Sequence, residues 1–176
     1  DPDRMNIQRS DYAMLSSKLL ANGEAVPTLD AYLDKMVEIG DIHLIIEIKE
    51  HATPQAESEL ARAVVTKVKE RKLQNSIDYQ SSRQHICNEL KRYAASSATV
   101  YFMGNNLTPE YVEGLGFSGI SYTVETFKRI PRWINEAHKL GLKVAVRGVT
   151  SADNGAWAKK SGADAIITTT PTTIKK

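Results

Sequence analysis

The sequence of 176 residues has very little cysteine and no long hydrophobic run. Its one cysteine, Cys87, cannot form an internal disulfide, and a zinc site built on several thiolates is excluded. No apolar stretch approaches the roughly 20 residues that a membrane-spanning helix requires. The formal net charge is only +2, and no basic run with interleaved aromatic residues occurs, so the sequence does not favour nucleic acid as a partner.

The remaining composition is that of an ordinary globular protein, with 41% hydrophobic and 25% charged residues. We therefore expect residues 1–176 to form one domain with its own core. The sequence opens at Asp1-Pro2-Asp3 without a methionine, and we expect a processed or trimmed chain. Missing targeting signals then carry no information on location, and the composition does not distinguish a cytoplasmic from an exported protein.

Strand and helix patterns alternate six times along the chain, which is typical of parallel strands with right-handed crossovers. We predict strands over 44–49, 76–80, 99–103, 119–123, 142–149 and 163–169. We predict helices over 10–20, 28–39, 53–71, 82–93, 108–114, 127–140 and 151–160.

Two architectures fit six strand–helix units: an open doubly wound sheet, or part of a (β/α)8 barrel, which needs about 250 residues when whole. An open sheet commonly carries a glycine-rich phosphate loop after an early strand, and we expect no G-x-G-x-x-G or Walker-type loop in this sequence. This favours the barrel, an α/β fold with about six of its eight units.

The predicted strand 44–49, L-I-I-E-I-K, is apolar but ends in an acid and a base. Side chains alternate in a strand, so Ile45, Glu47 and Lys49 share one face. In a parallel barrel, chemistry takes place at the carboxyl ends of the strands. A buried carboxylate needs a partner, and for Glu47 this is Lys49, a cation or both. The alternatives are a structural ion pair or a strand that ends in solvent.

Several segments resemble those of the glycerophosphodiester phosphodiesterase family. V-P-T-L-D-A-Y-L at 26–33, followed by L-I-I-E-I-K at 44–49, resembles the family's P-T-L-E-E-x-L and L-x-I-E-I-K motifs. L-G-L-K-V-A-V at 140–146 and G-A-D-A-I-I-T-T-T-P at 162–171 are similar to its G-x-x-V-x-V-W-T-V and G-V-D-G-I-I-T-D-x-P motifs. The segment 115–122 is similar to bacterial members, so the resemblance runs from about residue 6 to the end.

The resemblance implies a (β/α)8 barrel that hydrolyses glycerophosphodiesters to glycerol 3-phosphate and an alcohol. The family uses two catalytic histidines, in an H-R-G and a later H-D motif. It also uses Ca²⁺ or Mg²⁺, held by an E-x-D motif and by the glutamate of I-E-I-K. Carried over to this sequence, Glu47 is the metal ligand, and Lys49 lies beside the phosphate as a catalytic residue.

The sequence departs from this family because it contains no H-R-G, E-x-D or H-D motif. We expect the first two barrel strands to be missing and the chain alone to be inactive. The strands 44–49 and 163–169 would then be open edges, which invite self-association or pairing with a missing segment. One alternative is a non-catalytic remnant that acts as a binding module. Another is an independent open α/β domain that shares only the fold.

Further candidates for contact with the substrate lie at predicted strand ends: Tyr79, Gln80, Met103, Asn105, Tyr122 and Arg147. Arg147 stands where the family has the tryptophan of W-T-V. A guanidinium binds phosphate well, although a solvated or ion-paired strand end is an equal alternative. A threonine of the stretch T-T-T at 168–170 replaces the family's last aspartate.

Of the four histidines, only His51 follows Lys49 on the expected loop, and it is a candidate for substrate binding. His43 precedes its strand, at the opposite end from the expected site. His85 and His138 fall within predicted helices, where histidine is commonly a surface or packing residue.

Overall fold

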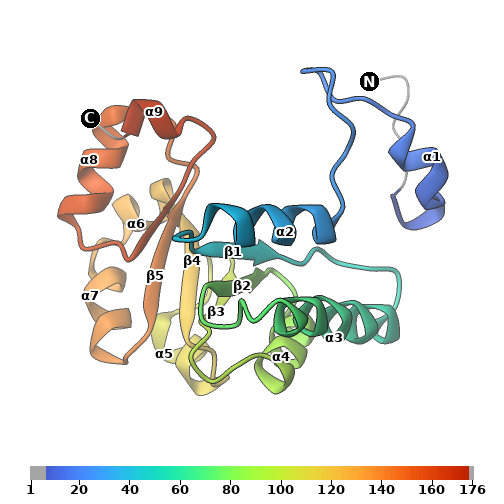
Figure 1. Ribbon diagram of the computed structural model, residues 1–176. Coiled ribbons are helices and arrows are strands. Elements are labelled where there is room, and N and C mark those ends of the chain that lie inside the picture. Colours follow the sequence, from blue (N-terminus) through green and yellow to red (C-terminus); the bar gives the residue numbers. More distant parts are fainter. Residues whose placement is uncertain (1–6, 175–176) are drawn as a thin grey trace.

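The computed structural model describes residues 7–174 (Figure 1). The six strands are β1 (Leu44–Glu47), β2 (Ile77–Ser81), β3 (Val100–Met103), β4 (Gly119–Thr123), β5 (Lys143–Arg147) and β6 (Ala165–Ile167). The helices are η1 (Ile7–Arg9), α1 (Tyr12–Ser16), α2 (Leu29–Ile39), α3 (Pro54–Glu70), α4 (Gln84–Tyr93), α5 (Pro109–Gly114), α6 (Val124–Arg129), α7 (Arg132–Lys139), α8 (Ala152–Lys160) and α9 (Pro171–Ile174).

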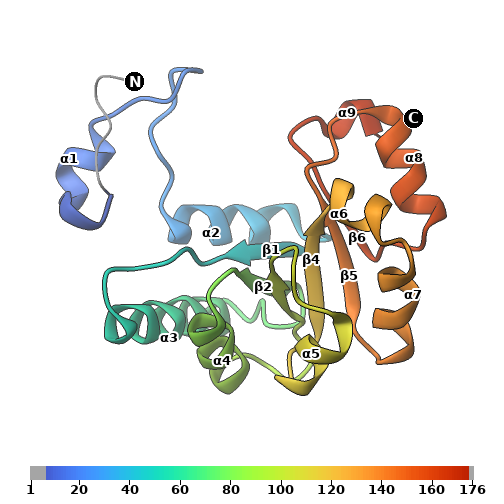
Figure 2. The ribbon, with the colours of Figure 1, turned by 180° about the vertical axis from the view of Figure 1, so that it is seen from behind.

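The strands form one parallel sheet in the order β1-β2-β3-β4-β5-β6. A doubly wound sheet reverses its strand order at a switch point, whereas the strands of a barrel follow one another around the wall. The sheet is therefore a curled half-barrel, and the prediction of an incomplete barrel is confirmed. β1 and β6 are its two edges. Figure 2, seen from behind, shows α3 and α4 beside β1 and β2, with α7 and α8 at the other end.

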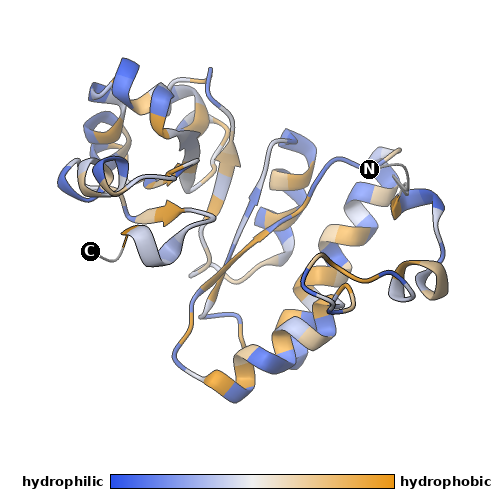
Figure 3. Ribbon diagram, turned by 90° about the horizontal axis from the view of Figure 1, so that it is seen from above, coloured by the Kyte–Doolittle hydropathy of each residue, from blue (hydrophilic) through white to orange (hydrophobic). Residues whose placement is uncertain are grey.

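Hydrophobic residues concentrate in the strands, while the helices carry hydrophobic and hydrophilic residues in alternation (Figure 3). The helices from α2 to α9 each bury at least one residue, whereas η1 and α1 bury none. In β1, Leu44 and Ile46 pack against the helix-covered core, and Ile45 lines a cavity of about 620 Å³ on the concave side of the sheet. Since Glu47 is two residues beyond Ile45, it lies on the concave side. No helix among residues 7–174 combines the length and the apolarity that a bilayer crossing needs.

One predicted helix, 127–140, is wrong: α6 and α7 occupy this region and are separated at Ile130 and Pro131. Proline has no N–H to donate, and it disfavours helical geometry at the residue before it. Ile130 accordingly has φ −131° and ψ 68°. The first helix, expected over 10–20, is only α1 and buries no residue. The strands at 44–49, 142–149 and 163–169 are shorter than predicted.

The expectation that the sequence has no G-x-G-x-x-G pattern is wrong, because residues 114–119, G-L-G-F-S-G, match it. They lead from the end of α5 into β4, so the glycines precede a strand. A phosphate loop needs the opposite order, from a strand into a helix N-terminus. Gly119 is instead required by packing, because a Cβ there would lie 2.5 Å from the ring of Tyr101.

A charged cluster joins the amino ends of β5 and β6, away from Glu47. The Asp164 carboxylate lies 2.9 Å from His138 Nε2 and 3.1 Å from Lys143 Nζ, and it accepts a hydrogen bond from the Val144 N–H at 2.8 Å. Burial by itself raises the pKa of Asp164, but the hydrogen bonds from Val144, His138 and Lys143 outweigh it. The pKa of Asp164 therefore lies below its ordinary value of 3.8.

This lowered pKa predicts a loss of stability in acid. A carboxyl whose pKa is lower in the folded chain stabilises the fold above its unfolded pKa, near 4, and this contribution disappears as the pH falls through the folded value. We expect Asp164→Asn to lower the free energy of unfolding at pH 7 and to reduce its dependence on pH below 4. Urea unfolding at several pH values measures both. Asn in place of the exposed Asp41 is the control, and an equal effect there would contradict the assignment.

Candidate functional site

Glu47 ends β1 on the concave side of the sheet, where a row of polar side chains crosses the strands. Its register partner in β2 is Gln80, whose Nε2 donates to Glu47 Oε2 over 3.5 Å. Gln80 Oε1 accepts a hydrogen bond from Ser121 Oγ of β4 at 2.9 Å. The Glu47 side chain is 31% exposed. The neutral donor holds the carboxylate in place without cancelling its charge, so this oxygen pair can still accept a cation.

Lys49 lies two residues beyond Glu47, and its Nζ is 3.8 Å from Glu47 Oε1. The side chain is 82% exposed. Such a long, solvated pair contributes little to stability, because water screens the charges and the lysine loses rotamer freedom. The lysine can therefore turn toward an anion at the carboxyl ends of the strands.

Arg147 is the last residue of β5, so it lies at the carboxyl end of the sheet, as Glu47 does. Its Nε donates to the Ser121 carbonyl at 3.2 Å and its Nη2 to the Gly104 carbonyl at 3.1 Å. The guanidinium thus ties together the carboxyl ends of β3 and β4. The sequence analysis proposed either a phosphate ligand or a solvated or ion-paired strand end. The structure instead shows the guanidinium bound to two backbone carbonyls. A role in substrate binding stays a prediction.

His51 lies on the loop after Lys49, as expected. Its Nδ1 is 2.9 Å from the Lys49 carbonyl oxygen. The residue lines a cavity of about 450 Å³, together with Ile7, Gln8, Arg9, Ala52 and Ala56. This cavity lies against η1 and is separate from the one on the concave side, so the geometry does not bring His51 to Glu47.

Tyr79 and Tyr122 lie in the helix-covered core, on the opposite side of the sheet from Glu47. Tyr79 pairs in register with Ile46, and both tyrosines are almost fully buried. Tyr122 donates its hydroxyl to the Leu107 carbonyl at 2.8 Å. Burial, reinforced by the charge of Asp78, raises the pKa of Tyr79 to about 12. The geometry gives no support for substrate contact, and we leave both residues out of the proposed site.

The other three histidines lie away from the row that Glu47 begins. His43 Nε2 is 3.0 Å from Asp78 Oδ2 at the amino ends of the strands. His85 contacts Ser58 Oγ at 2.9 Å, between α3 and α4, and His138 belongs to the cluster at Asp164.

Sequence reasoning missed Ser121, Glu57 and Arg83. Alternation from Gly119 places Ser121 on the concave face, so this residue was within reach of the pattern. Glu57 resembles an ordinary surface charge in the first turn of a helix, yet it is fully buried. Arg83 lies in the loop between β2 and α4 and contacts Glu57 of α3, and no spacing in the sequence reveals such a contact.

The described residues do not complete a metal site. Within residues 7–174, no group of three or more His, Cys, Asp or Glu side chains is placed to hold a metal ion. Ca²⁺ takes about six to eight oxygen ligands, and Mg²⁺ takes six with near-ideal geometry. Glu47 is suited to supply one of them, because it is an oxygen donor on the concave side.

The comparisons with known proteins decide the family. The model of the glycerophosphoryl diester phosphodiesterase family matches residues 3–173. The chain belongs to this family. It is 31% identical to a glycerophosphodiester phosphodiesterase from Parabacteroides distasonis, with a TM-score of 0.90, and the match covers 96% of this chain and 71% of that one. The comparison with curated proteins gives no match.

More distant structures share the fold of this family member. A glycerophosphodiester phosphodiesterase from Agrobacterium tumefaciens is 22% identical with a TM-score of 0.62, over 82% of this chain and 59% of that one. An Oleispira antarctica phosphodiesterase, solved with the product sn-glycerol-3-phosphate, is 16% identical with a TM-score of 0.69, over 86% and 60%. The chain therefore spans between 59% and 71% of these three proteins.

Proposed function

We propose that this family member takes part in the hydrolysis of glycerophosphodiesters to glycerol 3-phosphate and an alcohol. The observation that carries the proposal is the family match over residues 3–173, together with the shared placement of Glu47 and Lys49 at the carboxyl end of β1. In a parallel barrel this is the end at which substrates bind.

Glu47 is proposed as one ligand of a divalent cation, Ca²⁺ or Mg²⁺, whose other ligands lie outside residues 7–174. Carboxylate oxygen suits both ions. Such a cation, when bound, supplies charge stabilisation at a phosphodiester. Lys49 would add a second positive charge beside the phosphate, and its exposed ammonium has the freedom to do so.

We propose further that the 176 residues alone do not turn over substrate. The sequence has no H-R-G, E-x-D or H-D motif. The resemblance assigns the family's catalytic histidines and two of its carboxylates to these motifs. General acid–base catalysis would then need residues from elsewhere. In the chain alone, the open edges β1 and β6 are proposed to pair with another copy or another segment.

The alternative function is a non-catalytic binding module that kept the scaffold. Two observations favour it: the described residues lack a cluster of metal-binding side chains, and two donors of Arg147 are taken by backbone carbonyls.

The test compares the 176-residue chain with the same chain joined to the part of the Parabacteroides protein that it does not span, here called the joined protein. Release of glycerol 3-phosphate from glycerophosphocholine is measured with Ca²⁺, with Mg²⁺ and with a chelator. We expect turnover only in the joined protein and only with metal. A folded joined protein without turnover, under conditions where the Parabacteroides protein is active, would contradict the proposal and favour the binding module.

A further inference from the structure

The loop between β1 and α3, residues 48–53, carries Lys49 and is held by side chains from several parts of the chain. The amide of Gln8 in η1 bridges two backbone groups of the loop. Its Nε2 donates to the Glu50 carbonyl at 3.0 Å, and its Oε1 accepts from the Ala52 N–H at 3.0 Å. Because the strand ladder ends nearby, such side-chain contacts set the path of the loop.

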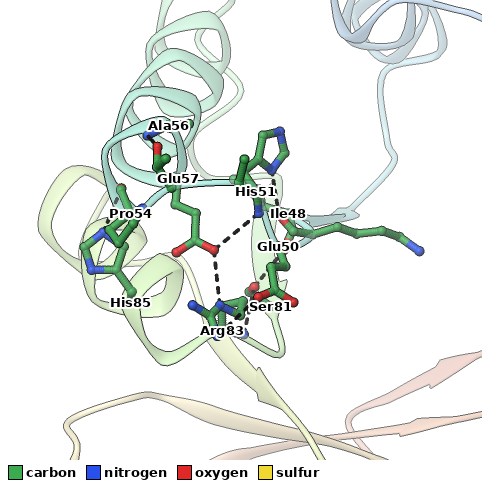
Figure 4. A network of polar contacts seen from close by, with 12 residues as sticks. Ile48, Glu50, His51, Pro54, Ala56, Glu57, Ser81, Arg83 and His85 are labelled. Carbon is green, nitrogen blue, oxygen red and sulfur yellow. Dashed lines mark hydrogen bonds and ion pairs between the residues drawn. The ribbon is translucent and has the colours of Figure 1, made fainter. Parts of the chain in front are cut away.

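Glu57, in the first turn of α3, points its side chain toward the same loop and toward Arg83 (Figure 4). The residue is fully buried. Its Oε1 accepts hydrogen bonds from the His51 N–H at 3.3 Å and from Arg83 Nε at 3.1 Å. Its Oε2 is buried and has no hydrogen-bond partner in the part of the chain that the structure describes.

Arg83 extends these contacts to the loop between β2 and α4. Its Nη1 is 3.5 Å from Glu50 Oε1, and its N–H donates to Ser81 Oγ at 3.2 Å. The Ser81 hydroxyl in turn donates to the Ile48 carbonyl at 2.6 Å. The carboxyl ends of β1 and β2 and the first turn of α3 are thus joined through one buried carboxylate.

A purely stabilising role explains this arrangement poorly. Burial of a charge is costly unless it is fully paired, and here the Arg83 partner is 43% exposed and one oxygen of Glu57 lacks a partner among the described residues. The helix N-terminus favours the charge, but an exposed glutamate in the first turn benefits from it as well. The carboxylate of Glu57 accepts a hydrogen bond from the N–H of His51, two residues after Lys49, and it also fixes the position of Arg83. An exposed glutamate would provide neither contact.

We propose that Glu57 is a positioning residue: it fixes the loop after β1 so that Lys49 and Glu47 stay together at the carboxyl end of the sheet. The consequence for hydrolysis rests on the proposed function. The effect on the loop does not, since it concerns the conformation of the chain itself.

The test is amide hydrogen exchange and backbone NMR on the 176-residue chain. In Glu57→Leu we expect the His51 amide to exchange about 10- to 100-fold faster, because its charged acceptor is lost. The signals of Lys49 and Glu47 are expected to move, while those of Val65 and Val68 in the C-terminal half of α3 stay in place. Glu59→Gln, on the exposed side of the same helix, is the matched control and should change none of these.

Glu57→Gln is the milder variant and serves if the leucine variant does not fold. It keeps an oxygen acceptor but loses the charge that holds Arg83, so the His51 amide should exchange faster than in Glu59→Gln and slower than in Glu57→Leu. Unchanged exchange at His51 would overturn the proposal, because the loop would then not depend on Glu57. An equal increase at Val65 and Val68 would also overturn it, because the substitution would then loosen the whole helix and indicate a structural role only.

The joined protein separates this inference from the proposed function. There, Glu57→Gln is expected to lower kcat about tenfold through misplacement of Lys49. If the loop moves and kcat is unchanged, the positioning role in hydrolysis is wrong. If the loop moves and no joined protein turns over substrate, the proposed function is wrong and the conformational inference stands.

Discussion

Replacement of Tyr122 by alanine is expected to lower the free energy of unfolding by about 3 to 5 kcal/mol, as for other large aromatic side chains in cores. The ring is completely buried. Its centroid lies 5.8 Å from that of Phe127 and 5.9 Å from that of Trp133, so its loss leaves a cavity between the sheet and two helices. Urea unfolding, followed by far-ultraviolet circular dichroism, measures the change.

Two controls show whether this effect comes from packing. Tyr122→Phe removes only the hydrogen bond to the Leu107 carbonyl and should cost about 1 kcal/mol. Alanine in place of Tyr111, which is 56% exposed, should change the stability by less than about 0.5 kcal/mol. A small effect of Tyr122→Ala on stability, combined with weaker substrate binding by the joined protein, would restore the sequence-based assignment of Tyr122 to the substrate pocket.

The helix starts show how much of the fold could be predicted from local sequence. Thr28, Thr53, Thr108 and Ser151 begin the predicted helices, and each accepts a hydrogen bond from the N–H three residues later. Capping depends only on neighbours in the sequence, so it can be predicted without the fold. The strand centres were predictable for a similar reason, since β-branched and aromatic residues mark them.

The face of a strand is harder to predict when both faces are buried. In β2, I-D-Y-Q-S, apolar and polar residues alternate from Ile77 to Gln80, but all five residues are buried, so the pattern does not tell which face the helices cover. Only the register with β1 reveals that Tyr79 follows Ile46 into the helix-covered core and that Gln80 follows Glu47. The sequence alone therefore could not show that Tyr79 lies on the helix-covered face.

The break between α6 and α7 was missed for a different reason. The apolar spacing of Trp133, Ile134 and Ala137 continues a helical period, and it concealed the effect of Pro131 on the backbone. The contact between Glu57 and Arg83 was missed because it joins the first turn of α3 to the loop between β2 and α4, which become neighbours only in the folded protein. Contacts at the carboxyl ends of parallel strands are of this kind, so the sequence indicated Glu47 and Lys49 but not what holds them.

Replacement of Lys49 by methionine in the joined protein is expected to lower kcat/KM for glycerophosphocholine about 100- to 1,000-fold. The reason is the loss of a positive charge beside the phosphate at the moment when negative charge develops on it. Methionine keeps much of the length and the apolar stem of lysine and removes only the ammonium. Steady-state release of glycerol 3-phosphate at saturating Ca²⁺ measures the change.

Stability separates this role from the structural ion pair that the sequence left as an alternative. The pair with Glu47 spans 3.8 Å and the lysine is 82% exposed, so its loss should cost less than about 1 kcal/mol. The matched control is Lys35→Met, which removes an exposed lysine paired with Glu38 on α2. A large loss of activity at Lys49, with stability equal to that of the control, identifies a functional lysine. If both variants keep full activity, Lys49 is only the partner of Glu47, and the proposed site must be sought elsewhere along the carboxyl ends of the strands.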